Sequence, residues 1–228
     1  MRDLLRSMRL SLGLLLGRRL GLFAAIDALV VGGAVFQMLL EGEGEASDLY
    51  RFVFLVPSVI LALPALAGMV DLERRAGCLD LALSAPSAEG YFLRRAGAVC
   101  AVTAAQGWLV ILLGWFLGDS ESTFPIVPPL VQVALVSLLL GAVSLFWAVR
   151  LRTAGAVWLA STVSLCVLGK WFFFNPIPPR YGEAFGSFLP GPEAALAWLG
   201  SAGVLAAGSA LFFLYARRRL RRPELIIS

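Results

Sequence analysis

The sequence of 228 residues contains no histidine, a single lysine and three cysteines, and only 15% of its residues are charged. Imidazole is a common general base and zinc ligand, so its absence removes the usual nucleophilic and zinc chemistry. The pattern G-x-S-x-G does not occur in the sequence. H-E-x-x-H is excluded because there is no histidine, and G-x-x-x-x-G-K-[ST] is excluded because Trp171 follows the only lysine, Lys170. We therefore predict no catalytic residue, no metal site, no cofactor and no ATP site in this chain.

Charge is scarce because apolar residues make up 59% of the chain and give it a mean hydropathy of +0.84. About a quarter of the residues of an ordinary soluble domain are charged, so this composition excludes a soluble enzyme. About 20 apolar residues cross a bilayer as one helix, which satisfies its own backbone groups. We predict an all-α polytopic membrane protein, one domain over residues 1–228 with six transmembrane helices at about residues 20–40, 52–70, 96–118, 130–149, 153–172 and 194–216.

The basic residues are divided unequally between the two sets of connecting segments. Sixteen of the nineteen lie before the first span, between spans two and three, between spans four and five, or after the sixth. Cytoplasmic loops carry the excess of arginine and lysine. We therefore expect both termini on the cytoplasmic side of the bacterial cytoplasmic (inner) membrane, and no nucleic-acid partner, since the basic residues report orientation.

Residues 1–18 are predicted to form an amphipathic helix that precedes the first span. On a helical wheel the arginines lie beside a single apolar sector. Such a helix lies along the membrane surface and contacts lipid headgroups, so membrane lipid is one predicted partner. An anchor and a mechanical role both remain open. The sector contains Met1, Leu4, Leu5, Met8, Leu12, Leu15 and Leu16.

Two polar side chains fall inside predicted spans. Asp27 lies in the cytoplasmic third of the first span, and Gln106 lies near the middle of the third. An ionisable group in a bilayer is costly and often marks a substrate path, although it can also reach interfacial water or a neighbouring helix. A buried glutamine more often joins two helices. Both residues are candidates for a translocation path or a subunit interface.

The cytoplasmic stretch between the second and third spans, residues 71–90, is too patterned for a plain loop. Asp71–Ser84 is predicted as a short helix with Glu73 and Asp80 on one face and leucines on another. Pro86 ends it, and Ser87 is predicted to cap a second helix that has Glu89 in its first turn. Such a segment can transmit force from a soluble partner to both spans. The apolar face is formed by Leu72, Ala76, Leu79 and Leu83.

These residues resemble the permeases of type 2 ABC transporters, the ABC-2 exporters. In that family a glutamate–arginine pair, a glycine, a leucine-rich turn and a proline–serine follow the second span. Cys78 here replaces the usual threonine, and Arg94–Arg95 replace the customary lysine. The layout of an elbow helix, six spans and internal termini is also similar, and by size it resembles the haem-exporter subunit of cytochrome c maturation. The matching positions are Glu73, Arg74, Gly77, Leu79, Leu83, Pro86 and Ser87.

The resemblance implies that two copies of a separate P-loop ATPase dock on residues 71–90, and that two permease subunits, identical or different, form the pathway. The expected function is ATP-driven export of an amphipathic or lipid-like substrate. Alternatives are a haem-exporter-type subunit, which the absence of histidine puts in doubt, and a non-transporting membrane scaffold. An intramembrane enzyme that uses Asp27 is the weakest alternative, because the carboxylate has no partner acid or metal.

Overall fold

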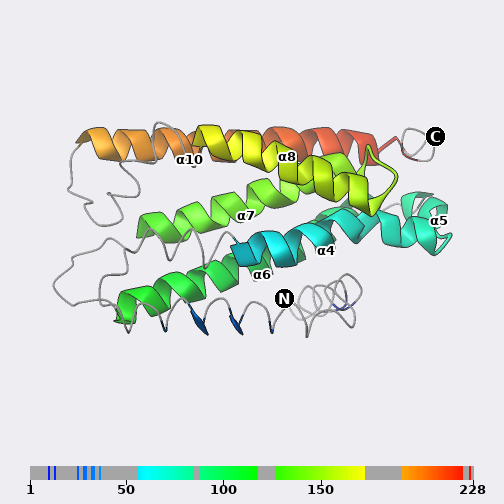
Figure 1. The fold of residues 1–228 in the computed structure, drawn as a ribbon. Coiled ribbons are helices and arrows are strands. Elements are labelled where there is room, and N and C mark those ends of the chain that lie inside the picture. The colour runs from blue at the N-terminus through cyan, green and yellow to red at the C-terminus, as the bar shows by residue number, and fades with distance from the viewer. Residues whose placement is uncertain are drawn as a thin grey trace.

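The computed structural model describes residues 56–84, 88–117, 127–172 and 192–222, and nine further positions singly. All regular elements in these residues are α-helices, which confirms the predicted all-α class. They are α4 (Val56–Arg75), α5 (Leu79–Ser84), α6 (Ala88–Leu117), α7 (Val127–Ala148), α8 (Ala154–Phe172) and α10 (Pro192–Leu220) (Figure 1). The single positions are Leu10, Gly13, Ala25, Ala28, Leu29, Gly32, Gly33, Phe36 and Ile226.

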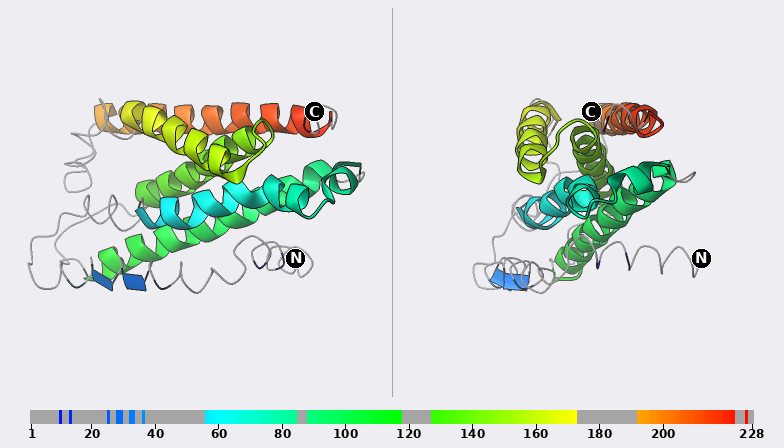
Figure 2. Two further views of the ribbon diagram at one scale, coloured as in Figure 1. Left: turned by 45° about the vertical axis from the view of Figure 1, so that its right-hand side comes forward. Right: turned by 90° about the vertical axis from the view of Figure 1, so that its right-hand side faces the viewer.

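The five long helices form a bundle in which α7 is central. Helices α4, α7 and α10 run in one direction, and α6 and α8 run in the other (Figure 1). Seen along the bundle, α4, α6, α8 and α10 surround α7 (Figure 2), and each of them packs against it. Because α7 is apolar on nearly all sides, a central position buries most of its surface. One core cluster joins Val133, Val136, Leu139 and Val143 of α7 to Leu205 of α10.

The described arginines gather at one end of the bundle, which we call the arginine-rich end. Helices α4, α7 and α10 end there, whereas α6 and α8 begin there, on the right in Figure 1. Lys170 lies near the other end, in the last turn of α8. The described arginines predicted to share one side of a membrane are thus brought together. They are Arg74, Arg75, Arg94, Arg95, Arg150, Arg152, Arg217, Arg218, Arg219, Arg221 and Arg222.

One helix of the described residues, Leu130–Ala148, is long and apolar enough to cross a membrane, and Ala154–Val167 is a shorter apolar helix. The same length and composition occur in core helices of soluble proteins. The six-span layout therefore stays a prediction. The amphipathic helix 1–18 and the first span 20–40, with Asp27, lie outside the described residues except for the single positions given above.

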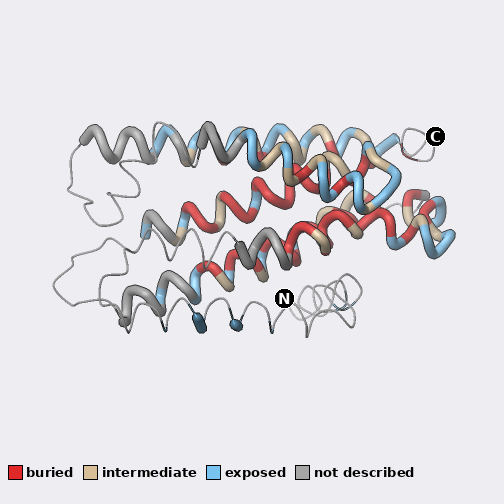
Figure 3. Tube along the Cα trace, in the orientation of Figure 1, coloured by how far each residue is buried: buried red, intermediate tan, exposed pale blue. Residues whose placement is uncertain are grey.

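The largest buried cluster lies toward the arginine-rich end and includes residues of all six described helices. Buried residues, drawn in red in Figure 3, make up much of α4, α6 and α7. Phe92, Leu66 and Met69 are among the largest side chains that are fully buried. Leu79 and Leu83 of α5 belong to the same cluster, and burying each leucine contributes about 1.5–3 kcal/mol. The short helix α5 is thus anchored in the core of the bundle.

Candidate functional site

The chain between α4 and α5 turns sharply at Gly77. This residue has a φ of +67°, and its backbone N–H donates to the carbonyl of Arg74 at 3.2 Å, while the N–H of Cys78 donates to the carbonyl of Glu73 at 3.0 Å. The pattern is a Schellman motif, in which a left-handed glycine ends a helix. The prediction of one helix over Asp71–Ser84 is therefore wrong. The helix breaks at residues 76–78, because glycine adopts this conformation without a Cβ clash.

The turn also separates the predicted apolar face into two parts. Leu79 and Leu83 are buried, but Leu72 and Ala76 are exposed. Since α5 starts in a new direction after Gly77, these four residues do not share one face as predicted. The side of α5 that remains accessible carries Asp80 and Leu81, and Leu81 is 74% exposed.

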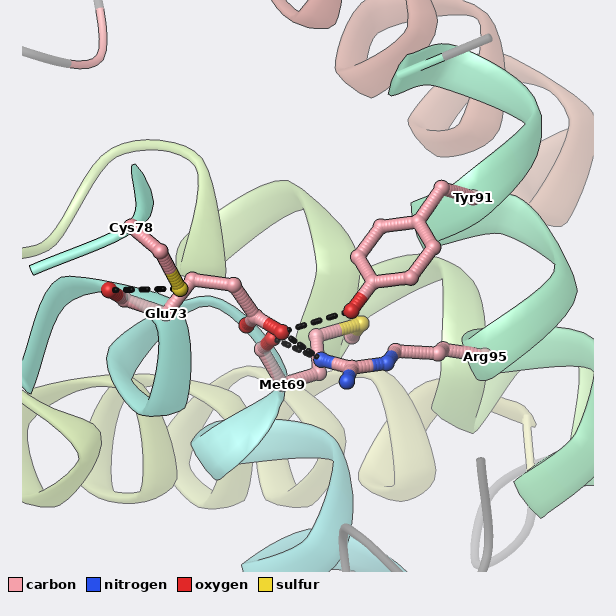
Figure 4. Close-up of polar contacts among 5 residues, drawn as sticks. All are labelled: Met69, Glu73, Cys78, Tyr91 and Arg95. Atoms are coloured by element: carbon pink, nitrogen blue, oxygen red, sulfur yellow. Dashed lines mark hydrogen bonds and ion pairs between the residues drawn. The ribbon is translucent and has the colours of Figure 1, made fainter. Parts of the chain in front are cut away.

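Glu73 is the centre of a buried polar cluster that joins α4 to α6 (Figure 4). Arg95 forms an ion pair with Glu73 Oε1 and donates a second hydrogen bond to the carbonyl of Met69 at 3.1 Å. The Tyr91 hydroxyl donates to the same Oε1 at 2.8 Å, and the Arg95 guanidinium lies 4.5 Å from the centre of the Tyr91 ring. Glu73 is 6% exposed and Arg95 is 3% exposed. Glu73, one of the residues predicted to couple the chain to an ATPase, is therefore buried inside the fold, next to α5.

This cluster depends on both charges being present. Glu73 Oε2 and Arg95 Nε are buried and have no hydrogen-bond partner within the described part of the chain. Each charge has left water, so the other charge supplies most of the compensation. The thiol of Cys78 donates weakly to the carbonyl of Glu73, with 3.7 Å between the sulfur and the oxygen. The ends of α4 and α6 on either side of α5 are held together by one charge pair.

The phenol of Tyr91 is expected to ionise only at high pH. Burial and the hydrogen bond to Glu73 raise the pKa of Tyr91 to about 12, whereas an unfolded tyrosine ionises near pH 10. The contribution of this group to stability is therefore complete below about pH 10 and is lost as the pH rises toward 12. A phenolate absorbance titration of the wild type minus that of Tyr91→Phe measures it, and a difference signal centred near pH 10 would contradict the geometry.

Further polar contacts connect neighbouring helices at the arginine-rich end. Glu89, in the first turn of α6 as predicted, accepts hydrogen bonds from Arg217 and Arg221 of the end of α10, the latter at 2.8 Å. The Arg221 and Arg217 guanidinium groups hold the pKa of the Glu89 carboxyl below its ordinary value. Arg74 donates to the backbone carbonyl of Arg152 in the connection between α7 and α8. These contacts tie the helix ends around α5 to the end of α10 and to the connection between α7 and α8.

The structure brings some predicted site residues together and leaves others apart. Helix α6 begins at Ala88, as predicted, but Pro86 and the capping Ser87 lie outside the described residues, as does Asp27. Gln106 lies about 16 Å farther along α6 than Arg95, at 1.5 Å per residue. Its Nε2 is buried without a hydrogen-bond partner in the described part of the chain. Gln106 therefore does not belong to the cluster around Glu73.

Sequence reasoning missed Tyr91 and Arg95 as functional residues, although a signal was present. Arg95 falls at helical spacing with the buried Phe92 and Val99, so a helix that buries this face also buries the arginine. Glu73 has the same relation to Leu66 and Met69 of α4. A buried arginine requires a carboxylate, and Glu73 is the carboxylate that faces it.

No family model, curated protein or solved structure matches this chain. An accessible short helix is set between two long helices, and a buried charge pair joins the ends of those helices. Helix α5 packs against both of them, and their relative position is fixed at Glu73 and Arg95.

Proposed function

We propose that this chain is the membrane-spanning permease subunit of an ABC exporter of the ABC-2 type. Two permease subunits, identical or different, form the pathway, and two copies of a separate P-loop ATPase dock on residues 71–90. ATP hydrolysed by that ATPase drives an amphipathic or lipid-like substrate across the bacterial cytoplasmic membrane. The observation that carries the proposal is α5, which lies accessible at the arginine-rich end and is anchored to two long helices.

The buried cluster supports a mechanical role for α5. The accessible Leu81 and Asp80 provide a contact surface, whereas Leu79 and Leu83 on the other side of the helix are in the core. A force on the accessible side is opposed by the core contacts and by the Glu73–Arg95 pair, so it moves α4 and α6 together. Interfaces that transmit motion need such rigid connections, because packed elements move as units.

The outer surface of the bundle supports its placement in a membrane. Large apolar side chains project outward along α8 and α10, where a soluble protein would carry charge. Helices of 19 to 30 residues are about 28–45 Å long at 1.5 Å per residue, enough to cross the hydrocarbon core. The exposed residues include Leu159, Val163, Val167, Leu211 and Leu214. Six spans with the arginine-rich end in the cytoplasm agree with this surface.

The proposal assigns ATP hydrolysis to a second protein. The 228 residues contain no Walker A pattern, which is consistent with a separate P-loop ATPase. Helix α5 is on the predicted cytoplasmic side, so the accessible Leu81 could contact a soluble ATPase there.

A docking variant tests the proposal. The chain is expressed with the P-loop ATPase encoded beside it, and the complex is purified and reconstituted in proteoliposomes. Leu81→Asp should lower permease-stimulated ATPase activity at least about tenfold, because a carboxylate in an apolar contact costs more than the 1.4 kcal/mol that a tenfold change represents. Val127→Asp is the matched control, since Val127 is also exposed but begins α7 at the opposite end.

Three outcomes would overturn the proposal. The first is that no P-loop ATPase copurifies with the chain. The second is that Leu81→Asp and Val127→Asp reduce stimulation equally. The third is that nucleotide has no effect on the reconstituted chain, which would favour the membrane scaffold. Export of haem by the same proteoliposomes would replace the amphipathic substrate by the haem-exporter alternative.

A further inference from the structure

A second cluster at the arginine-rich end surrounds Arg150, just after the end of α7. Its guanidinium lies 4.7 Å from the centre of the Phe146 ring and 4.9 Å from that of the Tyr215 ring. Arg150 Nη2 and Nε also donate to the Tyr215 hydroxyl at 2.6 and 3.1 Å. The rings of Phe146 and Tyr215 are in contact, with 4.9 Å between their centres. The exposed Arg150 is thus fixed in position by two aromatic rings.

The charge of Arg150 is not neutralised within the described part of the chain. Three of the described carboxylates at this end have other partners: Asp71 binds Arg75, Glu73 binds Arg95, and Glu89 binds Arg217 and Arg221. The fourth, Asp80, is on the accessible side of α5. No carboxylate oxygen of the described residues lies within ion-pair distance of Arg150. The Tyr215 hydroxyl also receives a hydrogen bond from Arg219. Two guanidinium groups therefore converge on one neutral oxygen, an arrangement that attracts an anion.

In the predicted six-span layout, the cluster lies at the boundary between the hydrocarbon core and the lipid headgroups. Arg150 follows the predicted fourth span, 130–149, and Tyr215 is next to the last residue of the predicted sixth span, 194–216. On α10, Leu211 and Leu214 are 69% and 51% exposed, and they precede Tyr215 along the bilayer direction. The Arg150 cation and its aromatic neighbours are therefore next to an apolar surface on α10. In a phospholipid, the phosphate and the acyl chains follow each other in the same order.

We propose that Arg150, Phe146 and Tyr215 form a binding site for the phosphate of an anionic phospholipid in the cytoplasmic leaflet. Arg150 binds the phosphate oxygens, the two rings hold its guanidinium in place, and the acyl chains lie along Leu211 and Leu214. The site rests on the membrane placement included in the proposed function, but not on ATP coupling. It would fix the ends of α7 and α10 to the leaflet while α5 moves.

Lipid binding tests the site without any ATPase present. Delipidated full-length protein in a neutral detergent is titrated with short-chain phosphatidylglycerol, and bound lipid is counted by native mass spectrometry. An arginine near an anionic surface contributes about fivefold to affinity, so we expect Arg150→Gln to bind phosphatidylglycerol about fivefold more weakly. Parallel titrations use phosphatidylcholine and inorganic phosphate, and we expect weaker binding of both.

Arg152→Gln is the matched control, because it removes the same charge from an exposed arginine of the same connection. It should change the affinity less than twofold. Equal losses in the two variants, or equal binding of phosphatidylcholine and phosphatidylglycerol by the wild type, would overturn the site. Inorganic phosphate that binds as tightly as the lipid would overturn the lipid as the source of the phosphate. Copurification of an ATPase is unaffected by any of these results, so the two proposals fail separately.

Discussion

Replacing Arg95 by methionine is expected to lower the free energy of unfolding by about 3–5 kcal/mol. The substitution keeps most of the length and apolar volume of the side chain, but it leaves the Glu73 carboxylate buried without its cation. Glu73→Met should have a similar cost for the opposite reason, since the Arg95 charge remains buried and the Tyr91 hydroxyl loses its acceptor. Unfolding in dodecyl sulfate, followed by circular dichroism, measures the change.

The double variant Glu73→Met, Arg95→Met separates the charge from the packing. With both charges removed, no unpaired charge is buried and only the Tyr91 hydroxyl has lost its acceptor. The stability should therefore return to within about 1 kcal/mol of the wild type or exceed it. Arg94→Met is the matched control, because Arg94 is the exposed neighbour of Arg95 on α6 and forms no ion pair with a described residue. It should cost less than about 1 kcal/mol. Additive losses in the double variant would contradict a buried, coupled pair.

The double variant also separates stability from coupling. If the Glu73–Arg95 pair only holds the fold together, the restored stability of the double variant should restore ATPase stimulation as well. If the directional contact between α4 and α6 transmits the load from α5, stimulation should stay reduced while stability recovers. Measured on one preparation, the two quantities therefore assign the pair either to the fold or to the lever that the proposed function requires.

Gly141→Ala is expected to lower the free energy of unfolding by about 1–3 kcal/mol, although alanine is the better helix former. A Cβ at Gly141 would overlap the sulfur of Cys100, and the next neighbour, Phe213, would be 3.9 Å away. The side chain of Cys100 is buried and cannot simply move into solvent. The missing Cβ allows α6 and α7 to approach closely, as small residues do where membrane helices pack.

Removing the sulfur should relieve this contact. In the Gly141→Ala background, Cys100→Ala should raise the stability, whereas in the wild type the same change should lower it by removing a buried group. Gly97→Ala on α6 is the matched control, since nothing lies within 4 Å of a Cβ added there. It should stabilise the protein by about 0.5–1 kcal/mol. A Gly141→Ala variant as stable as Gly97→Ala would show that the two helices are farther apart.

The long helices of the described part overlap the residue ranges predicted for spans two to six, but their bounds differ from the predicted bounds. The third span was predicted from residue 96, where the apolar run begins, whereas α6 begins at Ala88. The apolar run stops at Arg94 and Arg95, but the helical backbone continues through them. Likewise α10 extends past residue 216 through three arginines to Leu220. In these two helices, charge marks the edge of an apolar run and not the end of the helix.

Some features of the candidate site could be predicted from the local sequence, and others could not. Leu79 and Leu83 could be placed on a buried face from spacing alone, and Glu89 could be placed in a first helical turn. The break at Gly77 could have been predicted from its position after a basic helix end, yet the leucine pattern across it suggested one continuous helix. The pairs of Glu89 with Arg217 and Arg221 join residues more than 120 positions apart, and no local pattern predicts them.

Composition and periodicity by themselves determined that the described part of the chain is helical and that its helices are long and apolar. These properties are local, because each depends on residues within one or two turns of helix. Only the tertiary structure decided that Glu73 turns inward to Arg95, that Gly141 faces Cys100, and that Arg150 lies between two rings. Such contacts depend on how α7 is placed among its four neighbours, and the free energy of a buried charge or a close approach exists only once those helices have met.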